Sequence, residues 1–310
     1  MPTASRRELA VLGSPIAHSQ SPALHRAAYA VLGLPWSYQA IEVTASELAD
    51  FVRSRGREWR GLSLTMPLKH GVIPLVSTLD DLARLTGSAN TILFDAPNRA
   101  TAPALHGFNT DVAGIVHALG AAGLRSATLV HVLGSGATAA SALVASTQLG
   151  AERVVIWARN PDHAAALVPL AEQLGVRIEI RLPGQGTAEP FAELVISTLP
   201  GGANAGIDFS AELLARAMLL DVAYDPWPSV LAERWRQAGG QVLSGLAMLV
   251  HQALLQVRIF VTGTPLRPLE RENDVLTAML TAVRLDATGR QIDAADAPVG
   301  GQPRSAVPES

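Results

Sequence analysis

Cysteine is absent from the 310 residues of this chain. Its absence excludes disulfide bonds, thiolate metal ligands and cysteine nucleophiles, and fits a reducing compartment. Charged residues are also scarce, at 16% of the chain, and a net charge of -3 supplies no basic field for nucleic acid or an anionic membrane. We therefore expect a small-molecule ligand, with no nucleic acid, no membrane and no metal as a partner.

Long apolar runs are missing as well. No stretch of about 20 apolar residues is free of glycine, proline or charge, so the sequence predicts no transmembrane helix. The apolar run after Arg6 and Arg7 stops at Gly13, which is too short for the core of a signal peptide. The expected location is cytoplasmic, and the sequence allows a homodimer without indicating one.

What the chain does contain is apolar residues, at 48%, which is enough for two buried cores. The first third alternates strand-like and helix-like segments. Strands are expected at 8–13, 36–43 and 59–65, and helices at 21–33 and 45–56. This alternation indicates parallel βαβ units. A looser region rich in glycine, proline and asparagine follows, from Pro67 to Phe108.

A second alternating series follows a helical segment at 112–122. Strands are expected at 126–134, 152–159, 176–181, 193–199 and 217–224, with helices at 137–150 and 162–175. This series indicates a doubly wound, Rossmann-type sheet. Two closing helices, at 246–263 and 270–285, are expected to pack on the first domain.

The predicted fold is therefore α/β with two domains, an N-terminal substrate domain and a Rossmann-type nucleotide-binding domain. The first is expected to be discontinuous, formed by 1–112 and 245–285, with 113–244 as the second. Residues 286–310 lack apolar periodicity and are expected to form a flexible tail.

A glycine-rich loop lies between a predicted strand and a predicted helix. In "VLGSGATAA", Gly134, Gly136 and Ala139 have G-x-G-x-x-A spacing, with Ser135 and Ala137 in the same loop. The first glycine allows the tight turn, the second lets the backbone approach a pyrophosphate, and the small third residue allows close packing of the helix. The alternative is a tight turn with no ligand.

Cofactor choice depends on the end of the next strand. Enzymes that use NAD usually carry an acidic residue about 20 positions after the glycines, whereas arginine suits the 2′-phosphate of NADP. Here Arg159 occupies that region and no acid lies beside it. The sequence favours NADP over NAD, although Arg159 also fits an ordinary solvated cation.

Four segments carry polar side chains suited to chemistry. In "LSLTMPLKHG", Thr65 is expected to cap a short helix that tolerates Pro67 and brings Lys69 to the carboxyl edge of the sheet. A lysine beside a carboxylate can donate a proton during hydride transfer, and Asp111 in "GFNTDVAG" is the candidate carboxylate. The alternatives are that Lys69 is an ordinary surface lysine and that Asp111 belongs to a helix cap. The Asn90 side chain fits a hydrogen bond either to a ligand hydroxyl or within its own turn. Gln252 fits either a ligand contact or a solvent-facing position on its helix.

Near the start, "SPIAHSQSPALH" contains three serines. Ser21 followed by Pro22 is expected to form an N-cap and first helical residue. Because a hydroxyl has one donor and two acceptor positions, Ser21 can cap a helix and also donate to a carboxylate. Both interpretations stay open at this point.

The segments together resemble the shikimate dehydrogenase family. The shared stretches are "LGSPIAHSQSPALH", "LTMPLKHG", "GSANTI", "GFNTDVAG", "VLGSGATAA", "VISTLPGG", "DVAYDPWPSVL" and "GLAMLVHQA", which run from residue 12 to about 253. The resemblance implies an oxidoreductase of chorismate and aromatic amino acid biosynthesis, which reversibly reduces 3-dehydroshikimate to shikimate with NADP.

The resemblance also implies roles for individual residues. Lys69 and Asp111 would form the catalytic pair. Substrate would be bound by Ser19, Ser21, Thr65, Asn90, Tyr224 and Gln252, with the two serines on the carboxylate. Cofactor would be bound by Gly134, Ser135, Gly136, Ala137, Arg159, Thr198 and Gly245.

The chain departs from the family at two places. Ser63 stands where many relatives have an asparagine that contacts the ligand. Ala158 and His163 replace an asparagine and a basic residue near the 2′-phosphate, which predicts a weaker clamp. Ser21 favours shikimate, since quinate-using relatives tend to have threonine there. The alternatives are an NAD-dependent quinate/shikimate dehydrogenase, a non-catalytic sensor on this fold, and a methylenetetrahydrofolate-type dehydrogenase.

Overall fold

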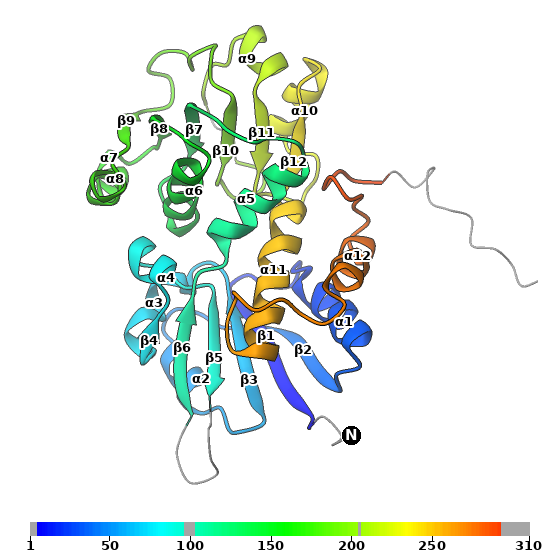
Figure 1. The fold of residues 1–310 in the computed structure, drawn as a ribbon. Helices are drawn as coiled ribbons and strands as arrows, with labels where there is room; N and C mark the ends of the chain where they lie inside the picture. Colours follow the sequence, from blue (N-terminus) through cyan, green and yellow to red (C-terminus); the bar gives the residue numbers. More distant parts are fainter. Residues whose placement is uncertain (1–4, 96–102, 204–205, 293–310) are drawn as a thin grey trace, which may run out of the picture.

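Two lobes, each built on a six-stranded sheet, make up the chain (Figure 1). The computed structural model describes residues 5–95, 103–203 and 206–292. Helices α5 (Asp111–Ala121) and α11 (Gly245–Thr262) run between the lobes in the centre of the molecule. The two-domain α/β prediction is confirmed.

The sheet of the first lobe is mixed. Its strands are β1 (Arg7–Gly13), β2 (Trp36–Glu42), β3 (Trp59–Leu64), β4 (Thr78–Leu79), β5 (Thr91–Asp95) and β6 (Ala104–Phe108), in the order β2-β1-β3-β5-β6-β4. The expected parallel pairing holds for β1 with β2 and β3, but β5 runs antiparallel to both β3 and β6. No strand direction was predicted for this region, and β6 runs antiparallel to β5 because the connection between them is too short for a crossover.

Short elements fill the part of this lobe that the sequence marks only as loose. Helices α1 (Ser21–Leu32) and α2 (Leu48–Arg53) lie within the predicted helical segments, and the loose region holds α3 (Leu68–Gly71), the 3-10 turn η1 (Ile73–Leu75) and α4 (Asp81–Thr86). At the start of α4, the Asp80 carboxylate accepts the N–H of Ala83 at 2.7 Å. These elements connect β3, which is followed by Thr65, to β5, which is preceded by Asn90.

The sheet of the second lobe is entirely parallel. Its strands are β7 (Leu129–Leu133), β8 (Arg153–Trp157), β9 (Arg177–Arg181), β10 (Leu194–Ser197), β11 (Met218–Asp221) and β12 (Val242–Ser244), in the order β12-β11-β10-β7-β8-β9. The order reverses between β7 and β10, which confirms the doubly wound prediction. Ligands of such sheets bind at this reversal, outside the carboxyl ends of the strands.

One predicted helix of this lobe is divided in two. The helices are α6 (Ala137–Gln148), α7 (Pro161–Ala165), α8 (Val168–Leu174), α9 (Ala211–Arg216) and α10 (Val230–Gln237). The single helix predicted at 162–175 is wrong because Pro169 has no N–H and its ring would clash with the carbonyl of Ala165 in a continuous helix. The chain turns between α7 and α8 instead.

The closing helices pack against α5 and α1. Helix α11 packs on α5, and α12 (Glu272–Ala282) packs on α1. Within the described residues, α11 alone is long and apolar enough to span a membrane, but 72% of that stretch is buried in the protein. Its apolar character is therefore accounted for by its place between the lobes.

The segment after α12 begins with an ordered turn. Leu285 forms a bridge with Gln291, and the Asp286 carboxylate accepts the N–H groups of Thr288 and Arg290. The expectation of a flexible tail from residue 286 is therefore wrong for 286–292, where local hydrogen bonds fix the backbone. Residues 293–310 lie outside the described part of the chain.

Buried histidines make the fold sensitive to acid. Burial lowers the pKa of His251 to about 4. Between its ordinary pKa of about 6.5 and this value, the unfolded chain binds a proton that the folded chain does not, so stability falls as the pH falls. We expect the step from pH 6.5 to 5 to cost about 2 kcal/mol for this group. Urea unfolding at pH 6.5 and pH 5 measures the free energy of unfolding. Between these pH values it should fall by about 2 kcal/mol less in His251→Gln than in the parent protein. Equal losses would contradict this account.

Candidate active site

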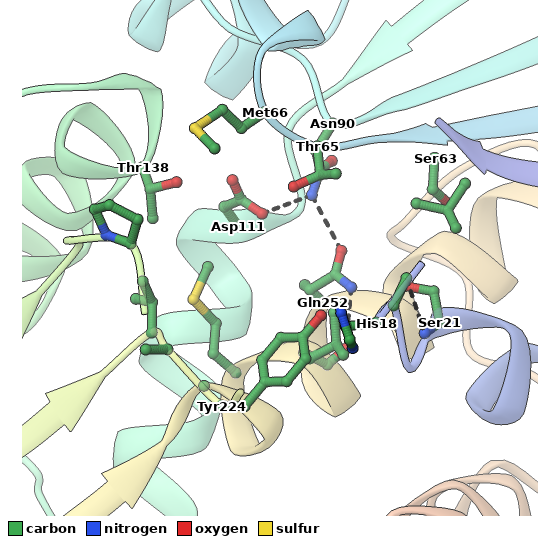
Figure 2. Close-up of a pocket in the computed structure, with 18 of the residues that line it drawn as sticks. His18, Ser21, Ser63, Thr65, Met66, Asn90, Asp111, Thr138, Tyr224 and Gln252 are labelled. Carbon is green, nitrogen blue, oxygen red and sulfur yellow. Dashed lines mark hydrogen bonds between the residues drawn. The ribbon is translucent and has the colours of Figure 1, made fainter. Parts of the chain in front are cut away.

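A cavity of about 420 Å³ lies between the two lobes. It opens at the carboxyl ends of the central strands of both sheets, and Figure 2 shows its labelled side chains converging from both lobes. Ten of the residues predicted from the sequence line it: Ser19, Ser21, Thr65, Lys69, Asn90, Asp111, Thr198, Tyr224, Gly245 and Gln252. The structure thus brings most of the candidate residues to one place.

Lys69 and Asp111 form a close ion pair at the wall of this cavity. The distance from Lys69 Nζ to Asp111 Oδ2 is 2.6 Å, and the two side chains are 13% and 5% exposed. The alternative of a surface lysine is therefore wrong. Lys69 lies on α3 directly after β3, and Asp111 is the first residue of α5.

The start of α3 differs from the predicted cap. The helix begins after Pro67, and it is the backbone carbonyl of Thr65 that accepts the N–H of Leu68 at 2.8 Å. The side-chain cap expected from Thr65 is wrong because the tight turn brings the backbone oxygen into the position that a capping hydroxyl would take. Its side chain is left to face the cavity, as Figure 2 shows.

The start of α5 is held by a neighbour of Asp111. Asn109 Oδ1 accepts the N–H of Asp111 at 2.9 Å, so the helix start is satisfied without the Asp111 carboxylate. The alternative of Asp111 as a cap is therefore wrong. The carboxylate is available to hold Lys69.

Asn90 completes the catalytic arrangement. Its Oδ1 accepts the backbone N–H of Thr110 at 3.0 Å, which fixes the amide orientation because that N–H can only donate. Its Nδ2 then donates to Asp111 Oδ1 at 2.8 Å and to Gln252 Oε1 at 3.1 Å. Asp111 therefore accepts from Asn90 on one oxygen and from Lys69 on the other. Such an arrangement orients the lysine before a ligand binds.

Gln252 and Tyr224 close the opposite side of the cavity. Gln252 is 6% exposed, so the alternative of a solvent-facing glutamine is wrong. Burial raises the pKa of Tyr224, which keeps its phenol protonated at neutral pH, and the backbone of Gln20 from the other lobe opposes part of this rise in pKa. His18 and Asp225 also meet across the lobes at 2.9 Å. These contacts bring the two lobes together around the cavity.

Helix α1 begins differently from the prediction. The N–H groups of Ala23 and Leu24 both bond to the carbonyl of Gln20, which makes Gln20 the N-cap. The expectation that Ser21 is the cap is wrong because the first turn closes one residue earlier, and Ser19 Oγ accepts the N–H of Ser21 at 3.4 Å. Ser19 supports the local backbone, and both serines line the cavity.

The glycine loop has the open geometry that a dinucleotide requires. Gly134 has φ +112, and a side chain there would collide with the hydroxyl of Thr198. Gly136 is the N-cap of the twelve-residue helix α6, carries no side-chain cap and has open space where a Cβ would lie. The backbone at the start of α6 therefore has open space beside Gly136 and no side chain capping its first N–H groups, which suits a pyrophosphate. Ser135 and Ala137 flank Gly136, although Thr138 rather than Ala137 lines the cavity.

The end of β8 lies beside this loop. The N–H of Gly134 donates to the carbonyl of Trp157 at 2.8 Å, and exposed Arg159 follows two residues later. Asn160 Oδ1 accepts the N–H groups of Asp162 and His163, so it caps α7. Arg159 and His163 are the side chains left at this edge for a phosphate.

The sequence left the role of Ser63 open, and the structure places it in the cavity lining. Other lining residues escaped the sequence predictions: His18, Met66, Thr138, Met248 and Gln256. Gln256 had a usable signal because it follows Gln252 by four residues and so lies on the same face of α11. Met66 and Met248 carry no polar group that would have marked them.

Comparisons with known proteins agree with this geometry. A family model described as the shikimate dehydrogenase substrate binding domain matches residues 11–92. The shikimate dehydrogenase (NADP(+)) of Oleidesulfovibrio alaskensis is 33% identical over 84% of this chain and 91% of that protein. The crystal structure of Mycobacterium tuberculosis shikimate dehydrogenase has a TM-score of 0.76, with 41% identity, and covers 89% of this chain and 99% of that one.

A second solved structure is the shikimate 5-dehydrogenase of Thermus thermophilus in complex with NADP(H) and shikimate. It is 30% identical with a TM-score of 0.71, and the match covers 89% of this chain and 99% of that one. Identity of this extent over nearly the whole length of these relatives reaches well beyond shared fold. The chain belongs to the shikimate dehydrogenase family.

Proposed function

We propose that this protein is an NADP-dependent shikimate dehydrogenase that reversibly reduces 3-dehydroshikimate to shikimate. The observation that carries the proposal is the buried Lys69–Asp111 pair, at 2.6 Å, in the same cavity as the substrate-side serines. A relative solved with NADP(H) and shikimate, and relatives named as NADP(+) enzymes, support the choice of substrate and cofactor.

Most of the proposed substrate-binding residues belong to the first lobe and α11, and Tyr224 reaches the cavity from the second lobe. Shikimate is a carboxylate with several ring hydroxyls, so it needs donors for the carboxylate and amides or hydroxyls for the ring. Ser19 and Ser21 would donate to the carboxylate, close to the start of α1, whose dipole favours an anion. The ring hydroxyls would be held by Thr65, Asn90, Gln252 and Tyr224.

Proton transfer is the task of Lys69. When bound, the nicotinamide supplies or accepts the hydride at the reacting carbon. Lys69 Nζ donates a proton to the oxygen of that carbon as the carbonyl becomes a hydroxyl, and takes it back in the oxidation direction. Asp111 holds the ammonium in place through its 2.6 Å contact, and Asn90 holds Asp111.

Cofactor binding falls to the second lobe. Gly134, Ser135, Gly136 and Ala137 would cradle the pyrophosphate, Arg159 the 2′-phosphate, and Thr198 and Gly245 the nicotinamide side. The proposal therefore assigns 1–112 with 245–285 to substrate and catalysis, and 113–244 to NADP. A cytoplasmic location and a homodimer are part of the same proposal, to be tested by fractionation and light scattering.

Turnover separates an enzyme from a sensor that only binds. The test is the absorbance of reduced nicotinamide after shikimate and NADP are mixed with the purified protein. Steady shikimate-dependent reduction of NADP is the expected result. Binding of both ligands without turnover would support the sensor and overturn the proposal.

The serine assignment predicts a separate effect on substrate affinity. Ser19→Ala and Ser21→Ala each remove a donor to a carboxylate, a bond worth about 1.5–3 kcal/mol. We expect KM for shikimate to rise by about 10-fold or more in each, with little change in kcat. The matched control is Ser14→Ala, since Ser14 is bonded to Glu42 and does not line the cavity. An unchanged KM in both variants would remove the serines from the binding site.

A further inference from the structure

A buried polar network adjoins the substrate side of the cavity, with Gln256 at its centre. Gln256 lies on α11, is 1% exposed and is a lining residue of the cavity. Its Nε2 lies 3.2 Å from the carbonyl of Asn90 and 3.0 Å from Thr91 Oγ1, and its Oε1 lies 2.8 Å from Ser63 Oγ and 3.3 Å from His25 Nε2. Neither the proposed catalytic pair nor the residues assigned to substrate and cofactor include this glutamine.

The orientation of the Gln256 amide follows from its partners. The carbonyl of Asn90 can only accept a hydrogen bond, so the amide nitrogen must face it. The amide oxygen must then face Ser63, and that oxygen can only accept. The single hydroxyl proton of Ser63 is therefore committed to Gln256.

Tyr38 occupies a second position on Ser63. Its phenol donates to Ser63 Oγ at 2.6 Å, and burial raises the Tyr38 pKa so that this proton stays in place. A serine hydroxyl has one proton and two lone pairs. With the proton on Gln256 and one lone pair on Tyr38, Ser63 has one lone pair left for the cavity that it lines (Figure 2).

His25 keeps the direction of this network constant. Burial lowers the pKa of His25 to about 3, so the ring is neutral. Because Gln256 Oε1 can only accept, Nε2 carries the ring proton, and Nδ1 accepts from the phenol of Tyr29 at 3.1 Å. The ring also stacks on Tyr38 with centroids 3.9 Å apart. The directions of the hydrogen bonds at Ser63 are thus set by protein groups and not by the ligand.

We propose that Gln256 is a specificity-determining positioning residue, which holds the Ser63 proton and so makes this part of the cavity accept a hydrogen bond without offering one. The inference rests on the proposed function, because it requires a substrate with ring hydroxyls. Ser63 then pairs with a hydroxyl that does not react, and it disfavours a carbonyl or a bare hydrogen at that position. A site built around a ligand hydroxyl rejects analogues that lack it, since its own polar group is left unpaired.

The test combines two variants with shikimate and its singly deoxygenated analogues. Ser63→Ala removes the acceptor and leaves Gln256 bonded to His25, Asn90 and Thr91. We expect KM for shikimate to rise by about 3- to 10-fold with little change in kcat. One deoxy analogue should bind equally well to the parent protein and to Ser63→Ala. The hydroxyl that this analogue lacks is the one from which Ser63 accepts a hydrogen bond.

Gln256 itself is tested by an apolar and a polar replacement. Methionine has a similar shape to glutamine, but Gln256→Met removes the oxygen that accepts the Ser63 proton. The preference for shikimate over the same deoxy analogue should therefore shrink. Gln256→Glu should restore it, because burial favours the protonated acid, which keeps a carbonyl oxygen for Ser63 and a donor for Asn90. Thermal unfolding and KM for NADP serve as controls, and Ser63→Ala carries the test if Gln256→Met does not fold.

Two outcomes would overturn the inference. One is a shikimate KM unchanged in Ser63→Ala and in Gln256→Met. The other is an equal loss for shikimate and for every deoxy analogue, since this would show a structural effect and not a hydrogen bond to one hydroxyl. Failure of the proposed function looks different, because the parent protein would then show no shikimate turnover at all.

Discussion

Lys69→Ala is expected to lower kcat for shikimate by about 10²- to 10⁴-fold, the usual contribution of a positioned acid–base group. The change in KM should be much smaller, because the lysine acts on the proton that moves and not on the carboxylate that anchors the substrate. Steady-state kinetics with shikimate and NADP measure both values. The size of the effect follows from the pair distance of 2.6 Å and from the burial of both side chains, which together hold the ammonium in one position.

Asp111→Asn is the companion variant. It keeps the side-chain shape and an oxygen for Lys69, but it removes the charge and turns an amide nitrogen toward Asn90 Nδ2, which can only donate, so kcat should fall. Thermal unfolding of both variants shows whether the loss is local. Near-normal turnover of Lys69→Ala would remove Lys69 from the mechanism.

Gly136→Ala is expected to weaken NADP binding by about 10- to 100-fold while the protein stays folded. The backbone at this position has φ -90, which alanine adopts without strain, and a Cβ would meet no protein atom within 4 Å. The added methyl instead occupies space that the pyrophosphate needs, and lost bonds to a charged group are worth about 1.5–3 kcal/mol. Titration with NADPH and thermal unfolding measure the two effects separately.

Gly134→Ala is the contrasting variant. Here φ is +112 and the new Cβ would collide with Thr198, so both stability and cofactor binding should fall. Unchanged NADPH affinity in Gly136→Ala would place the pyrophosphate elsewhere.

Local pattern predicted the second lobe better than the first. Five of the six strands of the Rossmann-type sheet lie within the predicted segments, and the three-residue strand β12 was not predicted. The antiparallel strand β5 was not foreseen as such, because strand direction depends on the connection around it and not on its own residues. Pro169 could have predicted the break between α7 and α8, since proline inside a helix removes a hydrogen bond.

Polar residues of the site could be predicted as candidates, but not their partners. Asn109, Thr110 and Asp111 at the start of α5 all suit a helix cap, and only the fold shows that Asn109 Oδ1 accepts the N–H of Asp111 while the Asp111 carboxylate holds Lys69. Ser21 before Pro22 likewise suited a cap that the backbone of Gln20 provides. The contact between Ser63 and Gln256 joins residues 193 positions apart, so no local pattern could indicate it.

The activity of this protein is defined by the substrate and the cofactor that it turns over. The most direct measurement is kcat/KM for four combinations, shikimate or quinate with NADP or NAD, followed by the absorbance of the reduced nicotinamide. The account predicts the highest value for shikimate with NADP, with an NADP preference moderated by Ala158 and His163. A higher value for quinate with NAD, or no turnover of shikimate with either cofactor, would contradict it.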